Sequence, residues 1–204
     1  MSLINETLKD FLEKVAEKTP TPGGGSVAAL AGAISSALLE MVCNLTIGKE
    51  KYKEFEEEMK IEREKCRNYR EKFINLIDED SKAFDEVISA FKLPKDYGGR
   101  KEAIQNAYKK ACAVPLETAE YCIKLMESGI KIAEKGNKNS ISDAGVASLM
   151  AKSAFHSAIL NVKINLSGIK DSDYVQKTKN HIKKMEYEAE NLHRKIMEVV
   201  ERWL

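Results

Sequence analysis

The sequence has no excess of charge of either sign, and this absence argues against one large class of function. Its 204 residues include 33 Lys and Arg against 32 Asp and Glu, for a net charge of +1. A protein that binds nucleic acid through the phosphate backbone needs a strongly basic face, so the composition gives no reason to expect a nucleic-acid partner. An acidic small molecule is still possible, because a few local cations are enough to bind one.

Paired cysteines are also missing. The four cysteines are widely spaced, and none belongs to a Cys-x-x-Cys pattern of the kind that holds zinc: Cys43, Cys66, Cys112 and Cys122. The spacing therefore predicts no metal site. We expect reduced thiols, as in a cytoplasmic protein.

Long apolar runs are absent as well. The longest, Val27–Leu39, covers about 13 residues and contains two serines, whereas a membrane-spanning helix needs roughly 20 residues. The first residues are acidic and only briefly apolar, unlike a secretory signal peptide. These features predict a cytoplasmic protein with no membrane partner.

Strand-type alternation never extends beyond a few residues, and apolar residues recur at helical spacing instead. The pattern predicts an all-α fold, with about seven helices in a single-domain helical bundle over residues 1–204. Ser26 is a candidate N-cap, Pro115 fits the first turn of a helix, and Gly136 fits a helix stop. The expected helices cover residues 4–18, 26–46, 51–92, 100–112, 115–135, 143–166 and 172–203.

Two of these helices, 26–46 and 143–166, are rich in Ala, Ser and Gly. Small side chains allow helix axes to approach closely, so we expect these two helices at the centre of the bundle. The long charged helices 51–92 and 172–203 would surround them. Faces of small residues also suit a subunit interface, although tight core packing explains most of these positions.

The loop before the first of these helices contains three consecutive glycines, Gly23, Gly24 and Gly25, followed by Ser26. A helix break needs only one glycine, and each further glycine costs backbone entropy on folding. The run makes sense if the backbone must approach a ligand closely, because unpaired N–H groups at the helix start can meet an anion or a carbonyl. The alternative is a flexible connector, and the Lys-Ser/Thr ending of a P-loop is missing.

One carboxylate interrupts an apolar stripe on the helix expected over 51–92. Asp80 lies on a stripe whose other members are Phe73, Ile77, Phe84, Val87 and Phe91. Burial raises the pKa of a carboxyl group and keeps it available as a proton donor at neutral pH. The alternative is a structural aspartate satisfied by a cap or a lysine. The neighbouring Asp78, Glu79 and Asp85 fall off the stripe, and we expect them to be solvated.

The segment around residues 136–145 contains polar residues that a helix stop and a helix start largely explain. Asp143 near the new N-terminus complements the helix dipole. Further along, Asn161 and Asn165 share one face of an otherwise apolar helix, so their amides need partners on another helix or a ligand. No Ser-His-Asp or Cys-His arrangement can be assembled from the three histidines.

Taken together in order, these segments resemble the cyclodeaminase/cyclohydrolase domain family. This family includes the C-terminal half of formiminotransferase-cyclodeaminase and stand-alone methenyltetrahydrofolate cyclohydrolases. The resemblance covers nearly the whole chain, and each of its motifs is weak when taken alone. The matching segments are residues 20–30, 41–46, 78–84, 93–95, 114–120, 136–137, 142–143 and 161–166.

The resemblance implies an all-helical fold, a homodimer, a folate site near the glycine loop and a catalytic aspartate at Asp80. The expected reaction is attack of N10 on the formimino carbon of 5-formiminotetrahydrofolate, followed by loss of ammonia to give 5,10-methenyltetrahydrofolate. Asp80 would protonate the leaving nitrogen. The residues expected to hold the substrate are Gly23, Gly24, Gly25, Ser26, Asn44, Asp143 and Asn161. No metal and no cofactor beyond the tetrahydrofolate substrate are expected.

Two alternatives remain open at this point. The same site could act as a methenyltetrahydrofolate cyclohydrolase, in which water opens the ring to the 10-formyl form. The chain could also be a non-catalytic helical dimerisation or scaffold module, since small-residue helices explain association without catalysis. An intact Gly23–Ser26 segment and Asp80 argue against the scaffold, because it needs neither.

Overall fold

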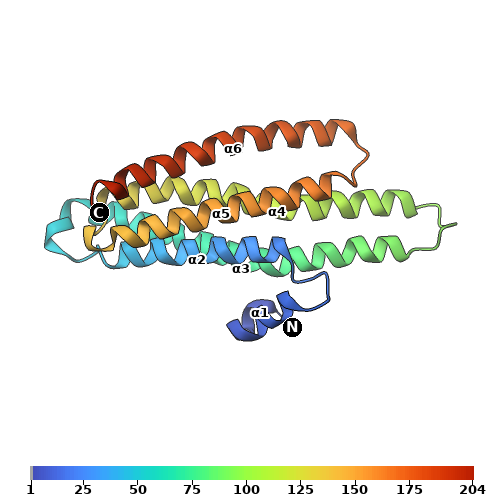
Figure 1. The fold of residues 1–204 in the computed structure, drawn as a ribbon, viewed down its shortest axis with the longest axis horizontal. Helices are drawn as coiled ribbons and strands as arrows, with labels where there is room; N and C mark the ends of the chain where they lie inside the picture. The colour runs from blue at the N-terminus through green and yellow to red at the C-terminus, as the bar shows by residue number, and fades with distance from the viewer. Residues whose placement is uncertain (1) are drawn as a thin grey trace.

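The computed structural model describes residues 2–204, and these residues form helices joined by short turns, without a β-strand (Figure 1). Three short 3-10 turns occur at Leu3–Asn5, Glu50–Phe55 and Lys138–Ser140. The all-α prediction is confirmed. The α-helices are α1 (Leu8–Ala16), α2 (Gly24–Asn44), α3 (Glu56–Lys92), α4 (Arg100–Lys135), α5 (Ile141–Leu166) and α6 (Ser172–Glu201).

Four of the helices form the bundle itself. In cross-section α2 packs on α3, α3 on α4, α4 on α5, and α5 back on α2. α6 lies over α4 and α5, and α1 projects from the bundle beside the start of α2 (Figure 1). The outward faces of α2 and α5 are therefore left without a covering helix.

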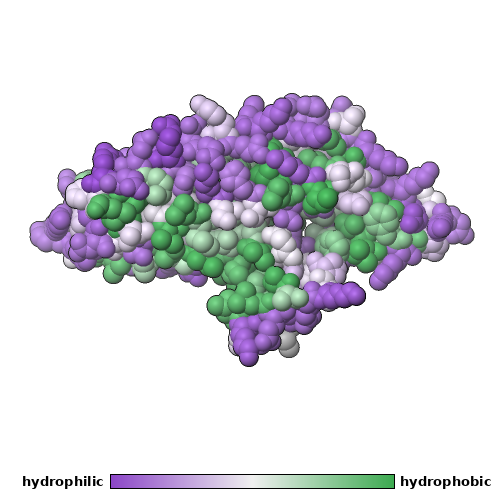
Figure 2. Space-filling model, in the orientation of Figure 1, coloured by the Kyte–Doolittle hydropathy of each residue, from purple (hydrophilic) through white to green (hydrophobic). Residues whose placement is uncertain are grey.

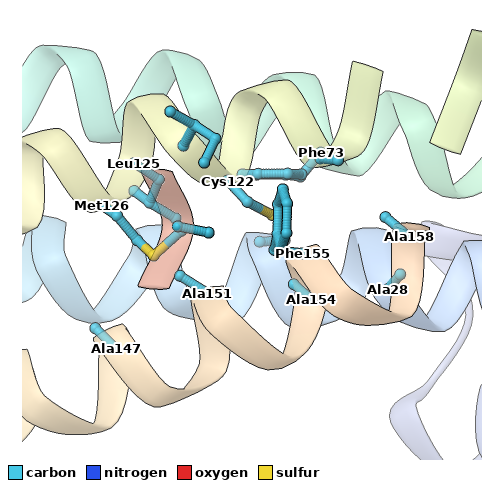
Figure 3. Packing of buried hydrophobic residues seen from close by; sticks show 14 of the residues in the cluster. Ala28, Phe73, Cys122, Leu125, Met126, Ala147, Ala151, Ala154, Phe155 and Ala158 are labelled. Carbon is cyan, nitrogen blue, oxygen red and sulfur yellow. The ribbon is translucent and has the colours of Figure 1, made fainter. Parts of the chain in front are cut away.

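The two small-residue helices pack against each other, as the sequence predicts. Ala28 on α2 and Ala154 and Ala158 on α5 are fully buried beside Phe155 (Figure 3). The Ser35 hydroxyl donates to the backbone oxygen of Ala147 at 2.7 Å, an approach that small side chains permit. The sequence predicts that the two charged helices surround this pair. This is confirmed for α6 only, because α3 is one of the four helices of the bundle itself.

The expected break before Pro115 is wrong, since α4 runs without interruption from Arg100 to Lys135. Proline lacks the N–H that would bond to the carbonyl of Ala111 one turn earlier. The side-chain amide of Asn165 on α5 donates to that carbonyl instead, at 2.8 Å. α4 can continue past Pro115 because a neighbouring helix supplies the missing donor. The described residues therefore form six α-helices instead of the seven that the sequence predicts.

Ser26 is not an N-cap. α2 begins two residues earlier at Gly24 with Gly23 as its cap, and the Ser26 side chain is completely buried inside the bundle. The stop at Gly136 is confirmed, because α4 ends at Lys135. Asp143 lies in the first turn of α5, as the dipole argument predicts.

α2 is long and apolar enough, by length and composition alone, to cross a membrane. In the folded chain 61% of its most apolar window is buried. Its hydrophobicity is therefore largely accounted for by packing inside the bundle.

Candidate functional site

A cavity of about 390 Å³ opens where the start of α2 meets the end of α5. α3 and α4 form its remaining walls. Its lining is polar on one side, with the glycine loop, Asp80 and two asparagines, and apolar on the other. The lining residues are Pro20, Thr21, Gly23, Gly24, Gly25, Asp80, Phe84, Val87, Ile88, Phe91, Tyr108, Ala111, Asn161, Ile164, Asn165 and Ser167.

The glycines bring the backbone of α2 directly against polar side chains. A methyl group on Gly25 would overlap the carboxylate of Asp80. A methyl group on Gly24 would lie 3.1 Å from the Nδ2 atom of Asn161, which is tighter than ordinary contact. The glycine run therefore serves close approach at these two positions, and the flexible-connector alternative does not explain it.

Asp80 is held at the N-terminus of α2 by Ser26. The Ser26 hydroxyl lies 3.0 Å from Oδ2 of Asp80 and 3.1 Å from the backbone oxygen of Ile77, so its single proton is shared between these acceptors. The hydroxyl of Ser81 lies 3.3 Å from the same oxygen of Ser26. The carboxylate is thus fixed in orientation while one edge faces the cavity.

Burial raises the pKa of the Asp80 carboxyl group above its usual range. The hydrogen bonds from the side chain and backbone of Ser26 oppose this change, because they stabilise the charged form. Desolvation is the larger effect. Asp80 is therefore more readily protonated near neutrality than an ordinary aspartate, as a general acid requires.

The apolar stripe around Asp80 is buried at its N-terminal end and partly exposed at its C-terminal end. Phe73 and Ile77 are fully buried on one side of Asp80, whereas Phe91 at the far end is 45% exposed and lines the cavity. The expectation for Asp78 is wrong. It is half-buried and accepts hydrogen bonds from the Ser2 hydroxyl and from the backbone N–H of Leu3, which fasten the N-terminal segment to α3.

The two asparagines on α5 have different partners. Asn161 donates to the backbone oxygen of Ser157 at 2.9 Å and lies directly against Gly24 in the cavity wall. Asn165 is engaged with the carbonyl of Ala111, as described above. Asn161 is therefore the better placed of the two to meet a ligand.

Phe84, Val87 and Phe91 of the predicted stripe line the apolar side of the cavity, but the contribution of Tyr108 was not identified from the sequence. Tyr108 on α4 packs edge-on against Phe91, with ring centroids 6.0 Å apart. Gly168 allows this position, because any side chain there would overlap the Tyr108 ring. A lone tyrosine on a charged helix gives no signal in the sequence, and only the packing of α3, α4 and α5 gathers these residues.

A family model described as formiminotransferase-cyclodeaminase matches residues 7–184. The chain belongs to the formiminotransferase-cyclodeaminase family. It is 42% identical over 200 residues to a methenyltetrahydrofolate cyclohydrolase of Methylorubrum extorquens, and the match covers 96% of both chains. The resemblance read from the sequence motifs is confirmed.

Two further members of the family extend the comparison. The formimidoyltransferase-cyclodeaminase of Rattus norvegicus is 31% identical over 192 residues, which cover 92% of this chain but 36% of the rat protein. The crystal structure of a formiminotetrahydrofolate cyclodeaminase from Thermotoga maritima superposes with a TM-score of 0.91, at 33% identity and 98% coverage of each chain. The fold is thus that of the cyclodeaminase.

Two residues of this chain that the sequence analysis expects at the site do not reach the cavity. Asn44 ends α2, about 30 Å from Gly24 at 1.5 Å per residue. Asp143 lies in the first turn of α5, about 27 Å from Asn161 by the same measure. The fold therefore gathers Gly23, Gly24, Gly25, Ser26, Asp80 and Asn161 at one end of the bundle and places Asn44 and Asp143 at the other.

The Gly136–Asn137 motif locks this second end of the bundle. Asn137 is buried, its backbone N–H donates to the hydroxyl of Thr46 at 2.8 Å, and its side chain donates to the carbonyl of Leu45 at 3.0 Å. The Tyr52 hydroxyl accepts a bond from the N–H of Lys138 at 3.0 Å. These bonds join the end of α2 to the turn between α4 and α5, so the motif is structural.

Within residues 2–204 no group of three or more His, Cys, Asp or Glu side chains is arranged to hold a metal ion. The four cysteines are buried and unpaired. Burial raises the pKa of the Cys43 thiol to about 12, so this thiol is poorly nucleophilic. Asp80 is thus the group at the cavity best suited to move a proton.

Proposed function

We propose that this chain is a formiminotetrahydrofolate cyclodeaminase, with Asp80 as its general acid. The single observation that carries the proposal is the carboxyl group of Asp80, whose pKa burial raises at the edge of a cavity shaped by the glycine loop. The family membership supplies the substrate class, because the similar proteins are named for folate one-carbon reactions.

The proposed reaction closes a ring between the two nitrogens of the folate. N10 attacks the formimino carbon carried by N5 and forms the new C–N bond, while the C=N double bond becomes single and the proton of N10 passes to the imino nitrogen, leaving an amino group on a tetrahedral carbon. Asp80 protonates that amino group, the C–N bond to it breaks, and ammonia departs to leave 5,10-methenyltetrahydrofolate. An unprotonated amine leaves poorly, so a placed acid contributes about 10²–10⁴-fold to the rate.

The apolar and polar sides of the cavity match the flat ring and the polar atoms of a folate. A flat conjugated ring can pack against Phe84 and Tyr108, while the amides of the glycine loop and Asn161 meet its polar atoms. The guanidinium of Arg100 lies over the Phe91 ring at the apolar end, 5.9 Å from its centroid. The same guanidinium donates to the carbonyls of Leu93 and Phe91, and we propose that its charge also attracts the carboxylates of the folate's glutamate tail.

A second candidate is methenyltetrahydrofolate cyclohydrolase, which the 42% identity to the enzyme of that name favours. In that reaction water adds to the methenyl carbon, and the ring opens to 10-formyltetrahydrofolate with release of a proton. Asp80 would then act first as a base, and a carboxyl pKa raised toward the operating pH suits a base as well as an acid, so the pKa does not separate the two reactions. The two reactions use the same substrate frame and the same carboxylate.

The absorbance of methenyltetrahydrofolate separates these candidates. Enzyme-dependent appearance from 5-formiminotetrahydrofolate establishes the cyclodeaminase. Accelerated loss of added methenyltetrahydrofolate, without the first activity, establishes the cyclohydrolase instead. Silence in both assays from folded protein would contradict both and favour the non-catalytic scaffold.

We further propose a cytoplasmic homodimer that needs no metal and no cofactor besides its folate substrate. The exposed apolar faces of α2 and α5 support the dimer. The four unpaired cysteines fit a reducing compartment. Full activity after dialysis against a chelator is the expected result for the purified protein, and restoration only by added metal would contradict it.

A further inference from the structure

A second cavity adjoins the substrate cavity. It lies between α3 and the N-terminal segment that leads into α2, has a volume of about 350 Å³ and shares Thr21 with the first cavity. Half of its lining residues are charged, namely Lys14, Glu17, Asp78, Lys82 and Asp85. A polar cavity of this size, much larger than the roughly 30 Å³ that one water molecule occupies, holds water.

This second cavity lies close to the bulk solvent. Lys82 and Asp85 on α3 and Glu17 at the end of α1 are exposed. In Figure 2, α1 and the segment that links it to α2 carry hydrophilic surface where they face away from the bundle. Protons in the second cavity therefore exchange with the solvent, whereas a folate that fills the first cavity excludes water from it.

Two serine hydroxyls connect Asp80 with the second cavity. Oδ2 of Asp80 lies 3.0 Å from the hydroxyl of Ser26, which lies 3.3 Å from the hydroxyl of Ser81. Asp80 lines the first cavity and Ser81 lines the second, while Ser26 is completely buried and lines neither. The three side chains thus form a path of hydrogen-bonding groups from one cavity to the other.

The longer step of this path is within reach of ordinary motion. A hydroxyl usually bonds to an oxygen at about 2.5–3.0 Å, so Ser26 and Ser81 must approach each other by a few tenths of an ångström. Thermal displacements of about 0.5 Å along each axis are typical of well-ordered atoms. The two hydroxyls therefore come within transfer distance without any change in the helices.

The Ser26 hydroxyl has an acceptor for each protonation state of Asp80. When Asp80 is ionised, Ser26 donates to its carboxylate and can accept a bond from Ser81. When Asp80 is protonated, its O–H can donate to Ser26, which then donates to the backbone oxygen of Ile77 at 3.1 Å. A rotation of one hydroxyl therefore resets the path after each transfer.

Each turnover of the proposed ring closure uses up the proton of Asp80. That proton leaves with the departing nitrogen, so Asp80 remains as a carboxylate and must regain a proton before it can act again. Its edge toward the first cavity is covered while a folate is bound, whereas Oδ2 still faces Ser26. The open direction for the returning proton is through Ser26.

We propose that Ser26 and Ser81 return the proton to Asp80 from water in the second cavity. A hydronium ion there gives a proton to the Ser81 hydroxyl, which passes its own proton to Ser26, and Ser26 passes its own to Oδ2 of Asp80. One proton enters, one reaches Asp80, and both serines end as neutral hydroxyls. The inference rests on the proposed function, and in the cyclohydrolase reaction the same path would carry the released proton outward.

The first test is kinetic and uses Ser81→Ala, which interrupts the path without touching Asp80. Rapid mixing with 5-formiminotetrahydrofolate is expected to show a burst of about one methenyltetrahydrofolate per site, because Asp80 starts protonated, and then a kcat about tenfold below that of the wild type. Ser81→Thr keeps the hydroxyl and should restore kcat. Ser89→Ala, an exposed serine on the same helix, is the matched control.

Two outcomes of this experiment would overturn the proposal. An unchanged kcat in Ser81→Ala would mean that Asp80 regains its proton by another route. Loss of the burst together with kcat would mean that Ser81 only supports the shape of the site.

An external acid provides a second readout. Imidazolium that enters the first cavity between turnovers can protonate Asp80 directly, so the kcat of Ser81→Ala should rise with imidazole concentration at constant pH, and that of the wild type should not. A lowered kcat that does not respond to imidazole would show that the lost step is not a proton transfer, and would overturn the proposal.

The last test needs no substrate. Ser26→Ala removes a hydrogen bond that stabilises the ionised carboxylate, so the pKa of Asp80 should rise above its wild-type value in a titration followed by ¹³C NMR. An unchanged pKa would break the path at its first step. A wild-type chain that turns over neither folate would refute the proposed function, while this titration would still decide whether Ser26 is joined to Asp80.

Discussion

At the scale of single residues, the site depends on the contact between Gly25 and Asp80. Gly25→Ala inserts a methyl group where the carboxylate lies, so Asp80 must move away from Ser26. Because small displacements of a catalytic group cost about 10²-fold, we expect kcat to fall by about that factor. Steady-state kinetics checks this, with Gly98→Ala as the control, since open space surrounds Gly98. Unchanged kcat in Gly25→Ala would show that the contact is not needed.

Asp80 should also reduce stability at neutral pH. Since burial raises its folded pKa, the folded chain binds more protons than the unfolded chain between the two pKa values. Its contribution to stability is complete below the unfolded pKa of about 3.9 and is lost as the pH rises through the folded pKa.

Asp80→Asn removes the loss of stability that ionisation of Asp80 causes. The Tm of the variant should therefore exceed that of the wild type at pH 7, and the difference should shrink toward pH 4. Thermal melts across this range measure it. Asp85→Asn, at an exposed position on the same helix, should show no such trend. A lower Tm for Asp80→Asn at pH 7 would mean that Asp80 is a structural residue.

Asp80 and the three glycines could be identified from the sequence because each breaks a local rule. An acidic residue interrupts an apolar stripe, and a helix start contains more glycine than a turn needs. Tyr108 breaks no such rule. Its place in the cavity follows from the packing of three helices, which single-residue patterns do not encode.

At the scale of helices, Pro115 shows how a local signal misleads. Proline favours a helix start, and this predicts two helices where α4 is continuous. The carbonyl of Ala111 is satisfied from α5 by Asn165, a partner 54 residues away in sequence. Helix existence was therefore predictable here, but this boundary depended on a tertiary contact.

A double-mutant cycle tests this contact. Asn165→Ala leaves the Ala111 carbonyl without its partner and should cost about 1–3 kcal/mol of unfolding free energy. Pro115→Ala restores a backbone N–H for the same carbonyl, so Asn165→Ala should cost less in the Pro115→Ala background. Urea unfolding of the four proteins measures the coupling. Strictly additive costs would show that the two residues act independently.

At the scale of the whole molecule, ligand binding should stabilise the folded chain. A ligand at 100 times its Kd adds about 2.7 kcal/mol to the free energy of unfolding, and for a chain of this size each kcal/mol raises Tm by about 2–4 °C. We therefore expect tetrahydrofolate to raise the Tm by several degrees. A scaffold without a folate site would show no shift, and Gly25→Ala should show a reduced one.

The far end of the bundle shows what the sequence could not provide. Asn44 and Asp143 belong to recognisable motifs, but helix geometry places both about 30 Å from the cavity of their own chain. Sequence motifs carry no information about which end of a folded bundle a residue reaches, and that depends on helix length and direction.

The central claim is that Asp80 supplies the proton for ring closure on a folate. The most direct measurement is the rate at which methenyltetrahydrofolate appears from 5-formiminotetrahydrofolate, compared between the wild type and a folded Asp80→Asn variant. The account predicts turnover by the wild type and a loss of about 10²–10⁴-fold in the variant, without a matching rise in KM. Wild-type turnover in Asp80→Asn would contradict it.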